Sequence, residues 1–183
     1  MPDPSANPSD RPPDAAAALY AALRDERDLS CVLLSASFLD RCLENLLEAY
    51  LAVSSTTEKL LDPRGGFLGS FAARSDACYC LGLVSKRFYQ NLLTVATLRN
   101  TFAHSHLDLS FEAPRIAELC FKLYTPPFIA DGCDIRARDD AEYQSLCGNA
   151  RDRFTIVVAL MANQLITRAA DTPHRPPASD WWS

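Results

Sequence analysis

The segment 98–106 holds the densest group of polar side chains in the sequence, with Arg99, Asn100 and His104 among them. A guanidinium presents a planar fork of donors that matches an anion such as phosphate. An imidazole titrates near neutral pH and can therefore exchange a proton with a bound molecule. These residue types make the segment the first place to look for a binding or catalytic site.

Helix geometry decides whether these side chains can act together. Five residues at about 100° each leave Arg99 and His104 roughly 140° apart around a continuous helix, so they would not face one substrate. Convergence requires the helix to end near Ala103, or two chains to pool their residues across a two-fold interface.

A structural interpretation of the same segment uses a different pair. Asn100 and His104 are i,i+4 neighbours, so Asn100 can bond the imidazole while His104 caps the helix or complements its negative C-terminal end. Arg99 then pairs with an acid such as Asp108 or Glu112.

The Arg-Asn pair with a His five residues after the Arg resembles the motif of the HEPN domains, small helical proteins that often act as metal-free endoribonucleases. In such enzymes the Arg binds phosphate, and the His serves acid–base chemistry or stabilises transition-state charge. The resemblance implies a metal-independent endoribonuclease that uses Arg99, Asn100 and His104.

A second candidate site is the glycine-rich segment 65–71, which leads into a helix N-terminus where free backbone N–H groups can receive an anion. It lacks the Lys of a P-loop and no strand precedes it, so a tight turn with Ser70 as helix cap is the simpler interpretation. Arg74, one turn into that helix, either joins Arg99 at a common anion site or is a solvated or salt-bridged surface residue.

The seven cysteines are odd in number and lie mostly among apolar residues, which predicts a reducing, cytoplasmic compartment and small core side chains. Cys78 and Cys80 with His104 and His106 offer zinc-type ligands. Residues two apart on a helix point to nearly opposite sides, however, so we expect no metal and no cofactor. Cys147 is a loose candidate nucleophile, because nothing in the sequence places a His beside it.

Composition restricts the class of protein. A chain of 183 residues with 48% hydrophobic and 22% charged residues fits one globular domain. Eighteen basic against 23 acidic residues give a net charge of −5, which disfavours direct binding to nucleic acid. The sequence has neither a signal-peptide pattern nor an apolar run of about 18 residues, so we expect neither export nor membrane insertion.

The apolar residues recur with a helical period nearly everywhere, which predicts an all-α helical bundle of about five to seven helices with one long irregular connection. No strand is predicted. The longest apolar stripe comprises Leu29, Val32, Ala36, Leu39, Leu43, Leu46 and Tyr50. The other helices are expected at 15–27 after a cap at Asp14, at 56–61, at 71–81 between Ser70 and Gly82, at 86–104 after Ser85, at 114–123, and from about 140 or 149 to 170.

The last of these helices is expected to be central. It carries its largest apolar side chains on one face, namely Phe154, Val157, Val158, Met161 and Leu165. The helical domain is expected to span residues 15–170. The Pro-rich segments 1–14 and 171–183 are expected to be disordered tails, although Trp181 and Trp182 could dock onto another surface.

Five ordered blocks of the sequence resemble the mannitol operon repressor family. They are Cys31 to Leu47, Gly66 to Arg74, Cys80 to Ser85, Leu98 to Ser105 and Asp108 to Glu112. The resemblance covers about residues 25–170 and implies an all-α fold and a bacterial role in controlling a sugar-alcohol operon. The Arg-Asn-x-x-x-His block of that family resembles the HEPN signature too, so one scaffold could have two uses. The Pro-rich N-terminal segment and the Trp181-Trp182 pair depart from the family pattern.

The sequence shows no helix-turn-helix with a basic recognition helix, so a repressor role would depend on a protein partner. That partner could be a DNA-binding protein, a phosphocarrier protein or a second copy of the chain. The first hypothesis is therefore a non-enzymatic, dimeric transcriptional regulator with Arg74, Arg99 and His104 as binding residues. The alternatives are the HEPN-like endoribonuclease and a repressor that binds DNA directly.

Overall fold

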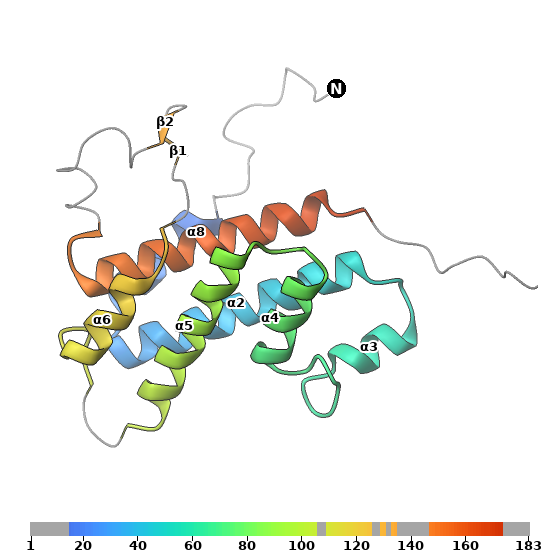
Figure 1. Ribbon diagram of the computed structural model, residues 1–183, viewed down its shortest axis with the longest axis horizontal. Helices are drawn as coiled ribbons and strands as arrows, with labels where there is room; N and C mark the ends of the chain where they lie inside the picture. Colours follow the sequence, from blue (N-terminus) through green and yellow to red (C-terminus); the bar gives the residue numbers. More distant parts are fainter. Residues whose placement is uncertain (1–14, 106–108, 126–128, 131–132, 135–146, 174–183) are drawn as a thin grey trace, which may run out of the picture.

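The structure is a computed structural model that describes residues 15–105, 109–125, 129–130, 133–134 and 147–173. Within these residues the chain forms seven helices around a single apolar core, and one very short β-hairpin (Figure 1). The predicted all-α single-domain bundle is confirmed. Most of the two predicted tails lies outside the described residues.

The elements follow one another along the chain in a simple order. The helices are α1 (Ala15–Arg24), α2 (Asp28–Tyr50), α3 (Ser55–Leu61), α4 (Phe71–Cys80), α5 (Lys86–Ala103), α6 (Pro114–Lys122) and α8 (Ala150–Asp171). The hairpin pairs β1 (Ile129–Ala130) antiparallel with β2 (Cys133–Asp134) in the long connection to α8. This hairpin departs from the strand-free prediction, because two residues per strand carry no periodicity that a sequence pattern can reveal.

Several helices begin at a side chain that caps them. Ser70 accepts a hydrogen bond from the backbone N–H of Ala73 at 3.2 Å, and Ser85 accepts one from that of Phe88 at 3.3 Å. Both caps were predicted and are confirmed. Gly82, just after α4, has a φ of 71°, a conformation that a glycine adopts without strain. The start of each of these two helices and the turn between them therefore depend on residues close by in the sequence.

The core lies where α8 meets α2. The apolar face of α8 is fully enclosed, with Phe154, Val157, Val158, Met161 and Leu165 at most 1% exposed. Helices α1 and α6 also pack on α8, and α4 and α5 pack on α2 (Figure 1). The central position predicted for the last helix is thus confirmed. The predicted α2 stripe is buried from Val32 to Leu46, whereas Leu29 at its start is 46% exposed.

Two arginines at the start of α8 fasten it to other elements. Arg151 forms an ion pair with Asp28 and donates to the backbone oxygen of Leu23 at 3.0 Å. Arg153 donates from Nη2 to the backbone oxygen of Leu123 at 2.8 Å. Neither arginine is therefore a solvated helix-end charge, because both guanidiniums bind backbone oxygens where other elements end.

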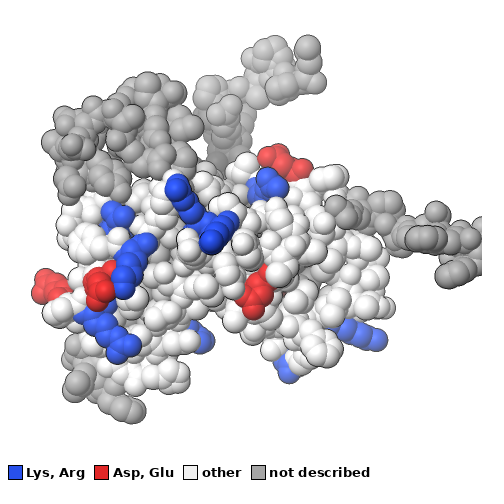
Figure 2. Space-filling view, viewed as in Figure 1, with Lys and Arg blue, Asp and Glu red and all other residues white. Residues whose placement is uncertain are grey.

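The surface in Figure 2 carries its basic side chains in small, separate groups with acidic and uncharged surface between them. A continuous basic stripe, which is the usual mark of a nucleic-acid interface, is not seen on this face. None of the helices described is both long and apolar enough to cross a membrane.

Candidate functional site

The Arg-Asn-x-x-x-His segment lies at the C-terminal end of α5. The helix ends at Ala103, and His104 is its C-cap residue with φ −100° and ψ 0°. The backbone N–H of His104 donates to the carbonyl oxygen of Asn100 at 3.1 Å. The helix therefore stops where convergence of Arg99 and His104 requires it to stop.

The hydrogen bonds made by these side chains differ from those expected in both the catalytic and the structural interpretation. Arg99 Nη1 donates to Asn100 Oδ1 at 3.0 Å, so the amide oxygen is engaged by the guanidinium. Within the described residues, no hydrogen bond joins Asn100 to the imidazole of His104, and no ion pair joins Arg99 to Glu112. Asp108, the other proposed partner of Arg99, lies outside the described residues. All three side chains of the motif are exposed.

Arg99 and Asn100 line an open pocket of about 610 Å³ between α2, the start of α4 and α5. Its other lining residues are Leu33, Ala36, Ser37, Asp40, Gly69, Ser70, Phe71, Ala72 and Ala96. His104 is not among them. The structure thus brings Arg99 and Asn100 together with Asp40 and Ser70, and it leaves His104 outside the pocket.

Arg74 is buried beside this pocket. Its side chain is 2% exposed; Nη1 donates to Asp40 Oδ1 at 2.8 Å and Nη2 donates to the carbonyl oxygen of Leu61 at 2.9 Å. Glu44 Oε1 lies 3.5 Å from Nη2. The predicted salt bridge is confirmed, but the expected surface position is wrong, because this guanidinium is buried where it ties α4 to α2 and to the end of α3. It does not line the pocket, so nothing here joins it to Arg99 at a common anion site.

The glycine-rich segment is a tight turn. An added Cβ would lie 2.3 Å from the carbonyl oxygen of Leu60 at Gly66, and 2.3 Å from that of Asp62 at Gly69. The backbone N–H groups of Gly66 and Leu68 donate to the carbonyl oxygens of Asp62 and Leu60, both at 2.8 Å. Glycine is therefore needed at Gly66 and Gly69 for close packing of backbone on backbone.

The buried cysteines are core residues. Burial raises the pKa of Cys31 and Cys42 to about 11 and that of Cys78 and Cys120 to about 12. A thiol with such a pKa carries almost no thiolate at neutral pH, so it is a poor nucleophile. Burial also raises the pKa of the Cys147 thiol, the candidate nucleophile of the sequence analysis.

The suggested zinc ligands do not converge. Cys78 is buried whereas Cys80, two residues later, is exposed, as helix geometry predicts. Within the described residues, no group of three His, Cys, Asp or Glu side chains is placed to hold a metal ion. His106 lies outside those residues.

Exposed leucines lie on the two helices that carry the pocket of Arg99, with Leu33 in its lining, and sequence reasoning missed their exposure. Leu29 and Leu33 are 46% and 36% exposed on α2, on the helix face that also carries Asp40. Leu93 is 44% exposed on α5 and shares a face with Asn100. We call this surface the Arg99 face, defined by Leu29, Leu33, Leu93, Arg99 and Asn100. Leu29 belongs to the predicted apolar stripe, but the structure leaves it 46% exposed.

Comparison of the sequence with protein-family models and with curated proteins gives no match. Among solved structures, the chain is similar to a chain of the X-ray structure of the MtlR-HPr complex from Escherichia coli. The two share 18% sequence identity with a TM-score of 0.56, over 85% of this chain and 98% of that chain. The likeness is one of fold. It agrees with the all-α architecture that the resemblance to mannitol operon repressors implies.

Proposed function

We propose that this chain is a non-enzymatic helical regulator that acts by binding another protein through the Arg99 face. The observation that carries the proposal is the likeness in fold to nearly the whole length of a chain crystallised in a protein–protein complex. The further proposal, which rests on the family resemblance, is that the regulated genes form a sugar-alcohol operon of the mannitol type.

The composition of the Arg99 face supports a docking role. The buried core of a protein interface is more apolar than the rest of the surface, Arg is enriched in interfaces, and a few anchor side chains carry most of the binding energy. Leu29, Leu33 and Leu93 supply exposed apolar surface, and the guanidinium of Arg99 donates to Asn100 at the pocket. Because MtlR of the similar structure is in complex with HPr, an HPr-type protein is the partner to test first.

The test is a binding titration by calorimetry with the HPr-type protein of the same organism. We expect Leu33→Asp to weaken binding at least about tenfold, since it places a charge on the docking surface. Leu81→Asp is the matched control, because Leu81 is 40% exposed at the opposite end of α4. For the anchor, Arg99→Ala is compared with Arg115→Ala on the exposed surface of α6.

Two outcomes of the titration would contradict the proposal. Absence of binding by the unmodified chain excludes an HPr-type partner. Equal effects of Leu33→Asp and Leu81→Asp exclude the Arg99 face as the docking surface. Light scattering on the chain alone tests the remaining possibility of a second copy as partner, in which case the Leu33→Asp variant is expected to shift the mass from dimer to monomer.

The endoribonuclease remains the second candidate, because α5 ends at Ala103 and leaves Arg99, Asn100 and His104 all exposed. A cleavage assay on single-stranded RNA in the presence of EDTA tests it. Activity that is lost in both Arg99→Ala and His104→Ala would favour the enzyme over the docking protein. We expect no such activity, because His104 does not line the pocket that Arg99 and Asn100 share.

Direct operator binding is the third candidate. Affinity that depends on phosphate contacts falls steeply with salt, so gel shifts with operator DNA at two salt concentrations test it. With a net charge of −5 we expect no shift at either concentration. A salt-sensitive shift would make the chain a DNA-binding repressor.

A further inference from the structure

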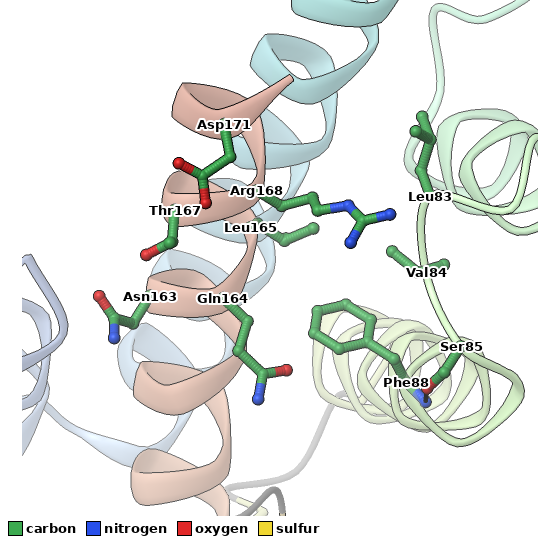
Figure 3. Close-up of a pocket in the computed structure, with 10 residues that line it drawn as sticks. All are labelled: Leu83, Val84, Ser85, Phe88, Asn163, Gln164, Leu165, Thr167, Arg168 and Asp171. Carbon is green, nitrogen blue, oxygen red and sulfur yellow. Dashed lines mark hydrogen bonds between the residues drawn. The ribbon is translucent and has the colours of Figure 1, made fainter. Parts of the chain in front are cut away.

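A second open pocket, of about 530 Å³, lies between the last turns of α8 and the turn that joins α4 to α5. Leu83, Val84 and Phe88 form its apolar wall. From the α8 side, Gln164 and Arg168 reach across toward that wall (Figure 3). The pocket is separate from the Arg99 face, and the proposed function does not use it.

The lining of this pocket includes two charged side chains. Arg168 and Asp171 are its charged lining residues, and neither has an ion-pair partner within the described part of the chain. A guanidinium beside an apolar wall is complementary to an aromatic ring, which it can cover, and to a neighbouring carboxylate. The occupant that fits best is therefore an aromatic side chain next to an acidic one.

The chain itself carries this combination just beyond the pocket. Helix α8 ends at Asp171, at the edge of the pocket, and Pro173 cannot continue the helix. Residues 174–183, which lie outside the described residues, contain the sequence Asp180-Trp181-Trp182 and with it both tryptophans of the chain. We propose that this segment turns back along α8 and inserts a tryptophan against Val84 and Phe88, with Asp180 beside Arg168.

The segment is long enough for this return. Trp181 follows Pro173 by about eight residues, which reach up to roughly 26–29 Å when extended. The α8 wall of the pocket, from Asn163 to Asp171, is only about 12 Å long. The order of the charges in the sequence agrees with a segment that reverses direction after Pro173. Such a segment would bring Arg175 close to Asp171 first and Asp180 close to Arg168 later, so that opposite charges meet.

Tethering makes a weak contact sufficient. A short linker holds its end near the attachment point at an effective concentration of about 1 mM or more. A segment that would bind with a Kd of only about 1 mM as a free peptide therefore occupies the pocket about half of the time when attached.

The intrinsic fluorescence of the full chain tests the proposal directly, because its only tryptophans are the two in this segment. We expect an emission maximum at shorter wavelength than that of a synthetic peptide of residues 172–183. We also expect acrylamide quenching to be reduced by about a quarter relative to the peptide, because one of the two tryptophans is shielded about half of the time. Emission and quenching equal to those of the peptide would overturn the proposal.

Matched variants locate the contact. Val84→Glu places a carboxylate in the pocket and is expected to return quenching to the peptide value. Val53→Glu, at a site 73% exposed between α2 and α3, should leave it unchanged. Equal quenching in the two variants would overturn the assignment to this pocket.

A charge exchange keeps the test valid even if Val84→Glu perturbs the fold. Arg168→Glu and Asp180→Arg are each expected to lower the ratio of docked to free segment about threefold, as for an exposed ion pair. The double variant should restore that ratio, and failure to restore it would refute the pairing of these two residues. A docked fraction that rises with protein concentration would assign the segment to a second copy, and would overturn the intramolecular proposal.

Discussion

The environment of Arg74 restricts which side chains can replace it. Its guanidinium is buried and is bonded by Asp40 and by the backbone of Leu61, with Glu44 nearby. Arg74→Met would leave the two carboxylates facing each other without their cation. We expect this change to lower the free energy of unfolding by about 3 kcal/mol, measured by urea denaturation.

The control for this prediction is Arg41→Met. Arg41 pairs with the same Glu44 at 2.8 Å but has a side chain 64% exposed. Exposed ion pairs contribute little, so its loss should be much smaller. Comparable losses in the two variants would mean that the burial of Arg74 does not determine its contribution.

His104 should contribute little to stability. The bond that caps α5 comes from the backbone N–H of His104, and an alanine would keep it. Within the residues that the structure describes, the imidazole makes no hydrogen bond. We expect His104→Ala to change the free energy of unfolding by no more than about 0.5 kcal/mol, as for most surface substitutions. A loss of more than about 1 kcal/mol would instead support the predicted structural bond between Asn100 and His104.

At the scale of single elements, the turn before α4 depends on close contact between backbone segments. Gly66→Ala would drive a Cβ into the carbonyl oxygen of Leu60, so the turn must shift. We expect a loss of about 2 kcal/mol in the free energy of unfolding. Gly65→Ala is the matched control, since nothing lies within 4 Å of a Cβ there and its φ is not in the left-handed region. Equal losses would show that the clash at Gly66 is relieved without strain.

The elements also show which features a sequence pattern can predict. The caps at Ser70 and Ser85 and the buried face of α8 follow from residues only a few positions apart, and all were predicted. Arg74 was misplaced because its partner Asp40 lies 34 residues away, and the contact of Arg151 with Asp28, 123 residues away, is equally invisible to a local pattern. In the candidate site, the pairing of Arg99 with Asn100 was missed because spacing favoured His104 as the partner of Asn100.

At the scale of the whole molecule, the buried thiols couple stability to alkaline pH. Burial raises the pKa of Cys31, Cys42, Cys78 and Cys120 from 9.0 to about 11 or 12. Above pH 9 the unfolded chain loses these protons while the folded chain keeps them, so the free energy of unfolding falls as pH rises. Each thiol contributes a slope of up to about 1.4 kcal/mol per pH unit between pH 9 and its folded pKa.

Urea denaturation at pH 8, 9 and 10 measures this slope. In Cys78→Ala the slope above pH 9 should be smaller than in the unmodified chain by about one thiol's contribution, whatever the variant's stability at pH 8. Replacement of the exposed Cys80 by Ala is the control and should leave the slope unchanged. An unaltered slope in Cys78→Ala would show that this thiol is not shielded from solvent.

The central position of α8 has a consequence for synthesis on the ribosome. About 100 residues separate the end of α2 at Tyr50 from the start of α8 at Ala150. At typical translation rates the apolar stripe of α2 therefore waits roughly 5–20 s before its main packing partner is made. During that interval the nascent chain presents uncovered leucines, so a trigger-factor-type chaperone should associate with it until α8 emerges. Ribosomes stalled shortly before codon 150 should carry more bound chaperone than those stalled well after α8 has emerged.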